Sequence, residues 1–106
     1  MHYPAVVHFA GDDELEIIQN QNELDQFIGN AQLTCSVIDH NGAIFTVTRT
    51  PNDKFSITDT NSYISHIDAV LLAQRHMAAL DQCCVAKFNA ATITAVIDAI
   101  VAIDQE

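Results

Sequence analysis

Apolar and polar residues alternate at the start of the chain, the pattern of strands with one buried face. Residues 4–10 and 14–19 carry this alternation. Between them, Gly11, Asp12 and Asp13 are residues that turns favour, because glycine accepts positive φ and aspartate bonds its own neighbouring backbone. We therefore predict a β-hairpin with a three-residue loop.

The loop length sets the register of this hairpin. A three-residue loop places Phe9 opposite Leu15 and Val7 opposite Ile17, which collects four apolar side chains on one face. We expect that face to be buried.

The middle of the chain, residues 33–58, alternates in the same way and predicts three antiparallel strands. Turn residues at 40–42 and 51–53 divide it. Gly42 should supply the left-handed residue of the first turn. The expected cross-strand pairs on the apolar face are Val37 with Phe45, Cys35 with Val47, and Val47 with Ile57.

Helical spacing of apolar residues appears in three other segments. Residues 20–30 predict a short amphipathic helix with Asn20 as its N-cap, and longer helices are expected over about residues 62–83 and 90–104. Ser62 or Ser65 and then Asn89 are the expected N-caps of the long helices. We therefore expect one α+β domain over residues 1–106, in β-β-α-β-β-β-α-α order, with helices packed on one face of an antiparallel sheet of about five strands.

The charge of the chain narrows its possible partners. Fourteen acidic residues against four scattered basic ones give a net charge of −10, which would repel nucleic-acid phosphates and anionic membranes. No apolar run is long enough for a membrane span, and the N-terminus lacks the features of a secretory signal. We expect a cytoplasmic protein that binds neither nucleic acid nor membrane.

The sequence offers no catalytic constellation. The Gly-Asp-Asp at residues 11–13 also occurs in the metal-binding hairpin of RNA-dependent polymerases, but a small acidic chain lacks the further aspartate, the basic groups and the channel that such a site needs. With three glycines in the chain, phosphate-binding and dinucleotide-binding loops are excluded. We expect no catalytic residues and no cofactor.

One weak ligand set remains as an alternative. His66 and His76 fall on one predicted helix, with Cys83 and Cys84 near its end, and together they could hold a metal or a small ligand. Adjacent cysteines point in different directions, however, and histidines on helices are usually structural. We therefore expect no metal site here.

The last predicted helix has two apolar faces. Isoleucines and valines form one stripe, and the opposite stripe consists of alanines. Such a helix is covered on both sides, either within the domain by residues 62–83 or by a second copy in a homodimer. The candidate dimer interface comprises Ala91, Ala95, Ala99 and Ala102.

The opening stretch "YPAVVHFAGDDELEII", followed by a short helix, a Thr-rich sheet and two helices, resembles a small family of uncharacterised bacterial proteins of gammaproteobacterial type. The resemblance implies a domain of unknown function and brings no catalytic residue onto this chain.

These observations favour a non-enzymatic, acidic protein-interaction or regulatory module that binds an unknown protein partner or associates with itself. The alternative is a small-ligand or metal-binding protein of modest enzymatic activity. A third hypothesis, mimicry of nucleic-acid charge, depends on how the carboxylates are arranged on the surface.

Overall fold

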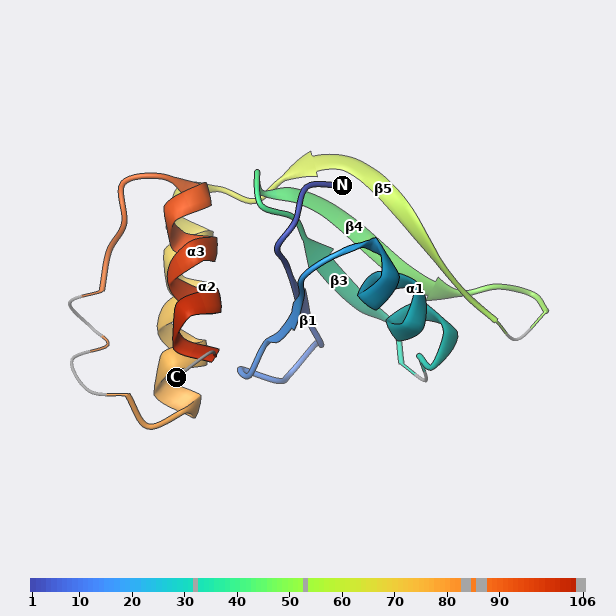
Figure 1. The fold of residues 1–106 in the computed structure, drawn as a ribbon, viewed down its shortest axis with the longest axis horizontal. Helices are drawn as coiled ribbons and strands as arrows, with labels where there is room; N and C mark the ends of the chain where they lie inside the picture. The colour runs from blue at the N-terminus through green and yellow to red at the C-terminus, as the bar shows by residue number, and fades with distance from the viewer. Residues whose placement is uncertain (32, 53, 83–84, 86–87, 105–106) are drawn as a thin grey trace.

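The expected element order is confirmed in the computed structural model, which describes residues 1–31, 33–52, 54–82, 85 and 88–104. Within these residues, five strands and three helices follow one another (Figure 1). They are β1 (Ala5–His8), β2 (Glu16–Ile18), α1 (Gln21–Gly29), β3 (Cys35–Ile38), β4 (Ala43–Arg49), β5 (Phe55–Tyr63), α2 (His66–Ala79) and α3 (Ile93–Asp104).

The strands form one antiparallel sheet in the order β2-β1-β3-β4-β5. The register predicted for the middle strands is confirmed, since Cys35 pairs with Val47, Val37 with Phe45, and Val47 with Ile57. The first strand lies between β2 and β3. The five-stranded antiparallel sheet expected from the alternating pattern is therefore confirmed.

The predicted register of the first hairpin is wrong by one residue. Val7 pairs with Glu16 and Val6 with Ile17, and the pairing ends there, so residues 9–15 connect β1 to β2 instead of a three-residue loop. The reason is that β1 is buried on both faces: Ala5, Val6 and Val7 are all fully buried. A register rule that assumes one apolar face cannot choose between the two alignments in such a strand.

The prediction that all helices pack on one face is also wrong. The face with Val37 and Val47 is covered by α1 through Leu24. The opposite face carries Val6 and Ile38, and these contact α2 and α3. Figure 1 shows α1 lying over the sheet and α2 and α3 beside it, as a parallel pair whose N-termini lie at the same end.

The sheet face against which α2 and α3 pack is mostly polar and rich in threonine, and this explains where the two helices lie. At one end of the strands, Ile38 and Ile44 interrupt that face and form an apolar surface against which α2 and α3 pack. Beyond the helices, Thr46 is half-buried, and Thr48 and Thr58 are exposed. The pair of helices therefore covers only the apolar end of a mostly polar surface.

The helix boundaries follow capping side chains. As predicted, Asn20 caps α1, accepting a hydrogen bond from the Glu23 N–H at 2.9 Å, and Ser65 caps α2. The predicted cap Asn89 is wrong for α3. Thr92 Oγ1 instead accepts from the Ala95 N–H at 3.1 Å, because the helix begins later than residue 90.

Candidate functional site

The acidic turn at residues 11–13 has a local structural role. Asp12 Oδ1 accepts a hydrogen bond from the Glu14 N–H at 3.0 Å, and Gly11 has φ of +82°. The Asp12 N–H in turn donates to the Phe9 carbonyl at 3.1 Å. These are the bonds of a turn-forming aspartate, as the sequence predicts.

Cys35 is a buried apolar side chain on β3. Its pKa is raised above the ordinary value of 9.0, first because burial disfavours the thiolate and then because of the Glu16 carboxylate. A nucleophilic cysteine needs the opposite shift. Cys35 therefore contributes packing.

His76 connects three parts of the fold. Its side chain is 1% exposed, and Nδ1 accepts a hydrogen bond from the Leu15 N–H at 2.9 Å. Nε2 lies 3.0 Å from Asp104 Oδ1 at the end of α3. Because Nδ1 is an acceptor, the ring proton is on Nε2 and is donated to Asp104. Both nitrogens are thus occupied by structural bonds.

Of the other members of the weak ligand set, His66 is described, and it does not join His76. His66 is exposed at the start of α2, and its Nε2 bonds the Ala90 carbonyl. Cys83 and Cys84 lie outside the described residues. Among the residues that the structure describes, no group of three or more His, Cys, Asp and Glu side chains could hold a metal ion.

Asp39 is a buried carboxylate that the sequence analysis did not single out. Its Oδ1 accepts from the Asn41 and Ala43 N–H groups at 2.9 Å each, and its Oδ2 from the His2 N–H at 3.1 Å. Asp39 is followed by His-Asn-Gly, and this turn pattern is the signal that could have marked it. It holds the β3–β4 turn and the N-terminus together.

The alanine stripe does not form one buried surface. Ala91 precedes α3, Ala102 is exposed, and Ala95 and Ala99 are half-buried. The buried residues of α3 are Val96, Ile97 and Ile100, on its other side.

A second apolar surface lies on α2. Ile67 is 72% exposed and Leu71, one turn later, is 40% exposed. They border a pocket of about 480 Å³. We name this surface the α2 patch; its residues are His66, Ile67, Val70, Leu71, Gln74, Phe88 and Asn89.

A groove of about 570 Å³ lies between α1 and β2. Its side chains are mostly apolar, with Glu16 and Glu23 among the polar ones. We name it the α1–β2 groove; its residues are Phe9, Glu16, Ile17, Ile18, Glu23, Gln26, Phe27, Asn30, Ala31 and Leu33.

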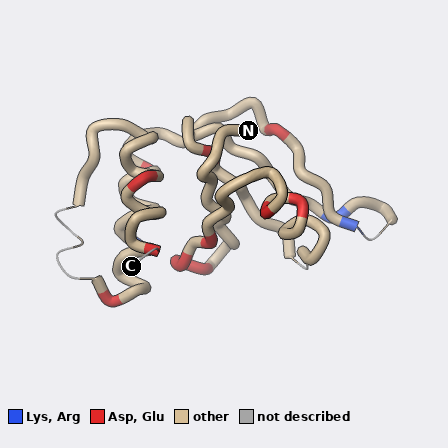
Figure 2. Tube along the Cα trace, in the orientation of Figure 1, with Lys and Arg blue, Asp and Glu red and all other residues tan. Residues whose placement is uncertain are grey.

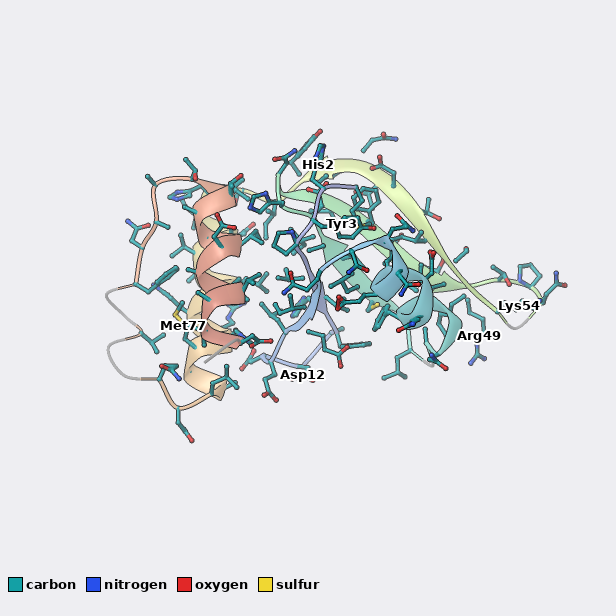
Figure 3. The ribbon with its side chains drawn as sticks, in the orientation of Figure 1. His2, Tyr3, Asp12, Arg49, Lys54 and Met77 are labelled. Carbon is teal, nitrogen blue, oxygen red and sulfur yellow. The ribbon has the colours of Figure 1, made fainter. Side chains whose placement is uncertain are left out.

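Charge is unevenly distributed over the molecule. Carboxylates gather on the β1–β2 loop and on α1, as Figure 2 shows. Arg49 and Lys54 lie at the tip of the β4–β5 hairpin, at the end of the molecule away from α2 and α3 (Figure 3). Near α1, the pKa of Tyr3 is raised, first by burial and then by the Asp25 carboxylate. The surface around α1 is therefore strongly acidic.

Comparisons with known proteins identify a family and a fold. No curated protein matches the chain, and none of the described helices has the length and apolar character needed to cross a membrane. The NMR structure of a protein from Shewanella amazonensis is similar, with a TM-score of 0.65 and 19% identity, over 99% of this chain and 89% of that one. That likeness shows a shared fold.

The family resemblance expected from the sequence is confirmed by a family model. The model is described as a protein structure with unknown function and matches residues 3–100. The chain therefore belongs to the family DUF4144.

Proposed function

We propose that this domain is a non-enzymatic, cytoplasmic protein-interaction module, and that the α2 patch is one of its contact surfaces. The observation that carries the proposal is the exposure of Ile67 and Leu71 on successive turns of α2, beside a pocket. Large apolar side chains that lie together on a surface are typical of sites that bind other proteins.

The energetics favour contact with a partner. Covering a large aliphatic side chain removes apolar area from water, which contributes about 25 cal/mol per Å². The described residues of the α2 patch include no aspartate, glutamate, lysine or arginine. A partner would therefore displace water there without burying a carboxylate, although the chain carries a charge of −10.

The chemistry of the described side chains supports binding over catalysis. The two buried polar side chains, His76 and Asp39, are both engaged in hydrogen bonds with the fold. The pKa of Cys35 is shifted away from reactivity.

The test replaces Ile67 and Leu71 together with serine. Tyr63→Ser is the matched control, because Tyr63 is 69% exposed and lies outside both the α2 patch and the α1–β2 groove. Light scattering over a range of concentrations measures self-association, and retention of bacterial proteins on immobilised domain measures partner binding. We expect the double variant to lose an association that wild type and Tyr63→Ser keep. Equal behaviour of all three proteins would refute the assignment of the α2 patch.

Self-association through the alanine stripe is a separate form of the proposal. Ala95 and Ala99 are half-buried on α3, and Ala99 packs against the edge of the core. Aspartate at either position would place a charge in such an interface, so Ala95→Asp should convert a dimer to a monomer. A dimer whose mass is unchanged by Ala95→Asp and Ala99→Asp would exclude this surface.

A further inference from the structure

The α1–β2 groove combines an apolar interior with polar groups around it. Phe9 and Phe27 contribute aromatic surface, with ring centroids 6.2 Å apart and an angle of 57° between the ring planes. Leu33 adds an apolar side chain that is 65% exposed. The volume of about 570 Å³ is large enough for one or two apolar side chains of a ligand.

The ionised groups of the groove are all of one sign. Glu16 and Glu23 line it, and none of its described residues is Lys, Arg or His. Glu23 Oε2 accepts a hydrogen bond from the Gln19 N–H at 3.3 Å. Glu16 is exposed, and its carboxylate forms no hydrogen bond or ion pair with any other described residue. Its carboxylate is therefore available to a cation.

The acidic field extends beyond the groove itself. Asp12, Asp13 and Glu14 occupy the loop before β2, and Asp25 lies on α1 (Figure 2). Arg49 and Lys54 are on the β4–β5 hairpin (Figure 3), and neither lines the groove. Surrounding carboxylates raise the local concentration of a cationic ligand and increase its association rate.

One side of the groove is the edge of the sheet. The residues of β2 line it, and β2 is the outermost strand, with β1 as its neighbour on the inner side. Within the described part of the chain, no strand pairs with the outer side of β2. An extended peptide can add to such an edge through main-chain hydrogen bonds, while neighbouring pockets accept its side chains.

We propose that the α1–β2 groove binds an extended segment of a protein partner in which lysine or arginine residues flank a large apolar side chain. The apolar side chain packs against Phe9, Phe27 and Leu33, and the cationic side chains pair with Glu16 and Glu23. The inference rests on the proposed function in treating the domain as a binding module. It uses a different surface from the α2 patch.

Charge complementarity distinguishes this occupant from others. A nucleic acid would bring phosphates toward two carboxylates, which costs free energy. A bound metal ion would leave the apolar interior of the groove unused. A peptide with both apolar and basic side chains can fill the apolar interior and also pair with the two glutamates.

The probe is a fluorescein-labelled eight-residue peptide in which lysine alternates with leucine, titrated by fluorescence anisotropy. Glu16→Gln with Glu23→Gln removes the two groove charges, and glutamine can still accept the capping hydrogen bond of α1. Asp68→Asn with Asp81→Asn removes the same charge at exposed positions on and beside α2. We expect the groove variant to raise the Kd at least about tenfold and the control at most about twofold.

Leu33→Ser tests the apolar half of the groove. It should weaken the lysine-leucine peptide without removing charge, whereas Ile67→Ser with Leu71→Ser should leave peptide affinity unchanged. Amide chemical-shift changes should be concentrated on α1 and β2. A peptide that alternates glutamate with leucine should not bind.

Several outcomes would overturn the inference. An equal loss of affinity in the Asp68/Asp81 variant would mean diffuse charge attraction. Absence of binding to wild type would exclude the groove as a basic-peptide site, while the α2-patch variants would still decide the proposed function. A concentration-dependent mass that is lost in the Glu16/Glu23 variant would identify a second copy as the occupant instead.

Discussion

His76 is the residue at which the hairpin loop and both long helices meet. Its Nδ1 holds the Leu15 N–H, which precedes β2, and its Nε2 holds Asp104 at the end of α3. A buried N–H group without a partner costs about as much as a lost hydrogen bond. The neutral ring with its proton on Nε2 is the form that satisfies both neighbours.

Replacing His76 with leucine should therefore destabilise the domain. The Leu15 N–H would remain buried without an acceptor, at a cost of about 1–3 kcal/mol. Urea unfolding monitored by circular dichroism measures the change. Arg75→Leu is the control, because Arg75 is exposed on the same helix, and it should change stability by less than about 0.5 kcal/mol. Equal effects of the two substitutions would contradict the structural role of His76.

Cys35 should make the domain less stable at alkaline pH. Its pKa in the folded state is raised above 9.0 by burial and by Glu16, so the folded state keeps a proton that the unfolded chain loses. The contribution is complete below the unfolded pKa and is lost as the pH rises through the folded value.

The comparison of wild type with Cys35→Ala isolates this effect. We expect the stability advantage of wild type to shrink between pH 8 and pH 10, as measured by urea unfolding at each pH. Cys83 and Cys84 are present in both proteins, so their titration cancels. A difference that is constant over this range would show that the thiol ionises equally in both states.

At the scale of the elements, β3 and β4 are specified by their own sequence. Val37 and Val47 are buried on one face, and turn residues fix the alignment, so the pairing could be predicted. The same rule failed in the first hairpin because Val6 and Val7 are buried on opposite faces. Residues next to a strand do not reveal whether a distant helix covers its second face.

Gly42 is the residue that closes the β3–β4 turn. Its φ is +89°, as the turn pattern predicts, and a Cβ placed there would lie 2.9 Å from Cγ2 of Ile93 on α3. Alanine would therefore meet both an unfavourable backbone conformation and a clash with the helix.

Gly42→Ala should destabilise the domain by at least about 1–2 kcal/mol. Gly29→Ala is the control, since Gly29 ends α1 and a Cβ there would contact nothing within 4 Å. It should be neutral or stabilise by up to about 1 kcal/mol. Thermal unfolding of both variants provides the measurement, and a Gly42→Ala protein as stable as wild type would refute the close contact with α3.

The orientation of α2 could not be predicted from its residues. Ile67, Val70 and Leu71 are as apolar as the buried Leu72 and Met77, so the periodicity favoured no single face. The spacing of apolar residues places His66 on the broad apolar side of the helix and His76 on its more polar side. The structure buries His76 and exposes His66. The packing of α2 against α3 decided the orientation.

For the whole molecule, composition predicted the net charge but not where the charged residues gather on the surface. The acidic residues between Asp12 and Glu16 are brought beside those between Glu23 and Asp25 because β2 leads directly into α1. The α1–β2 groove between them joins Phe9 to Leu33, which are far apart in sequence. Only the strand order places these residues together, so the groove could not be found from local patterns.

This concentration of carboxylates predicts that salt stabilises the domain. Like charges on the loop and on α1 repel one another in the folded state, and salt shortens the range of that repulsion from about 30 Å at 10 mM to about 8 Å at 150 mM. The free energy of unfolding should rise by about 1 kcal/mol over this range, and calorimetric scans at fixed pH would measure it.

Asp13→Asn with Glu14→Gln removes two loop charges whose carboxylates form no hydrogen bond or ion pair with the described residues. That variant should be more stable than wild type at low salt and less sensitive to added salt, because part of the repulsion is already gone. If the variant and wild type respond equally to salt, the repulsion comes from the rest of the surface and the loop does not concentrate it.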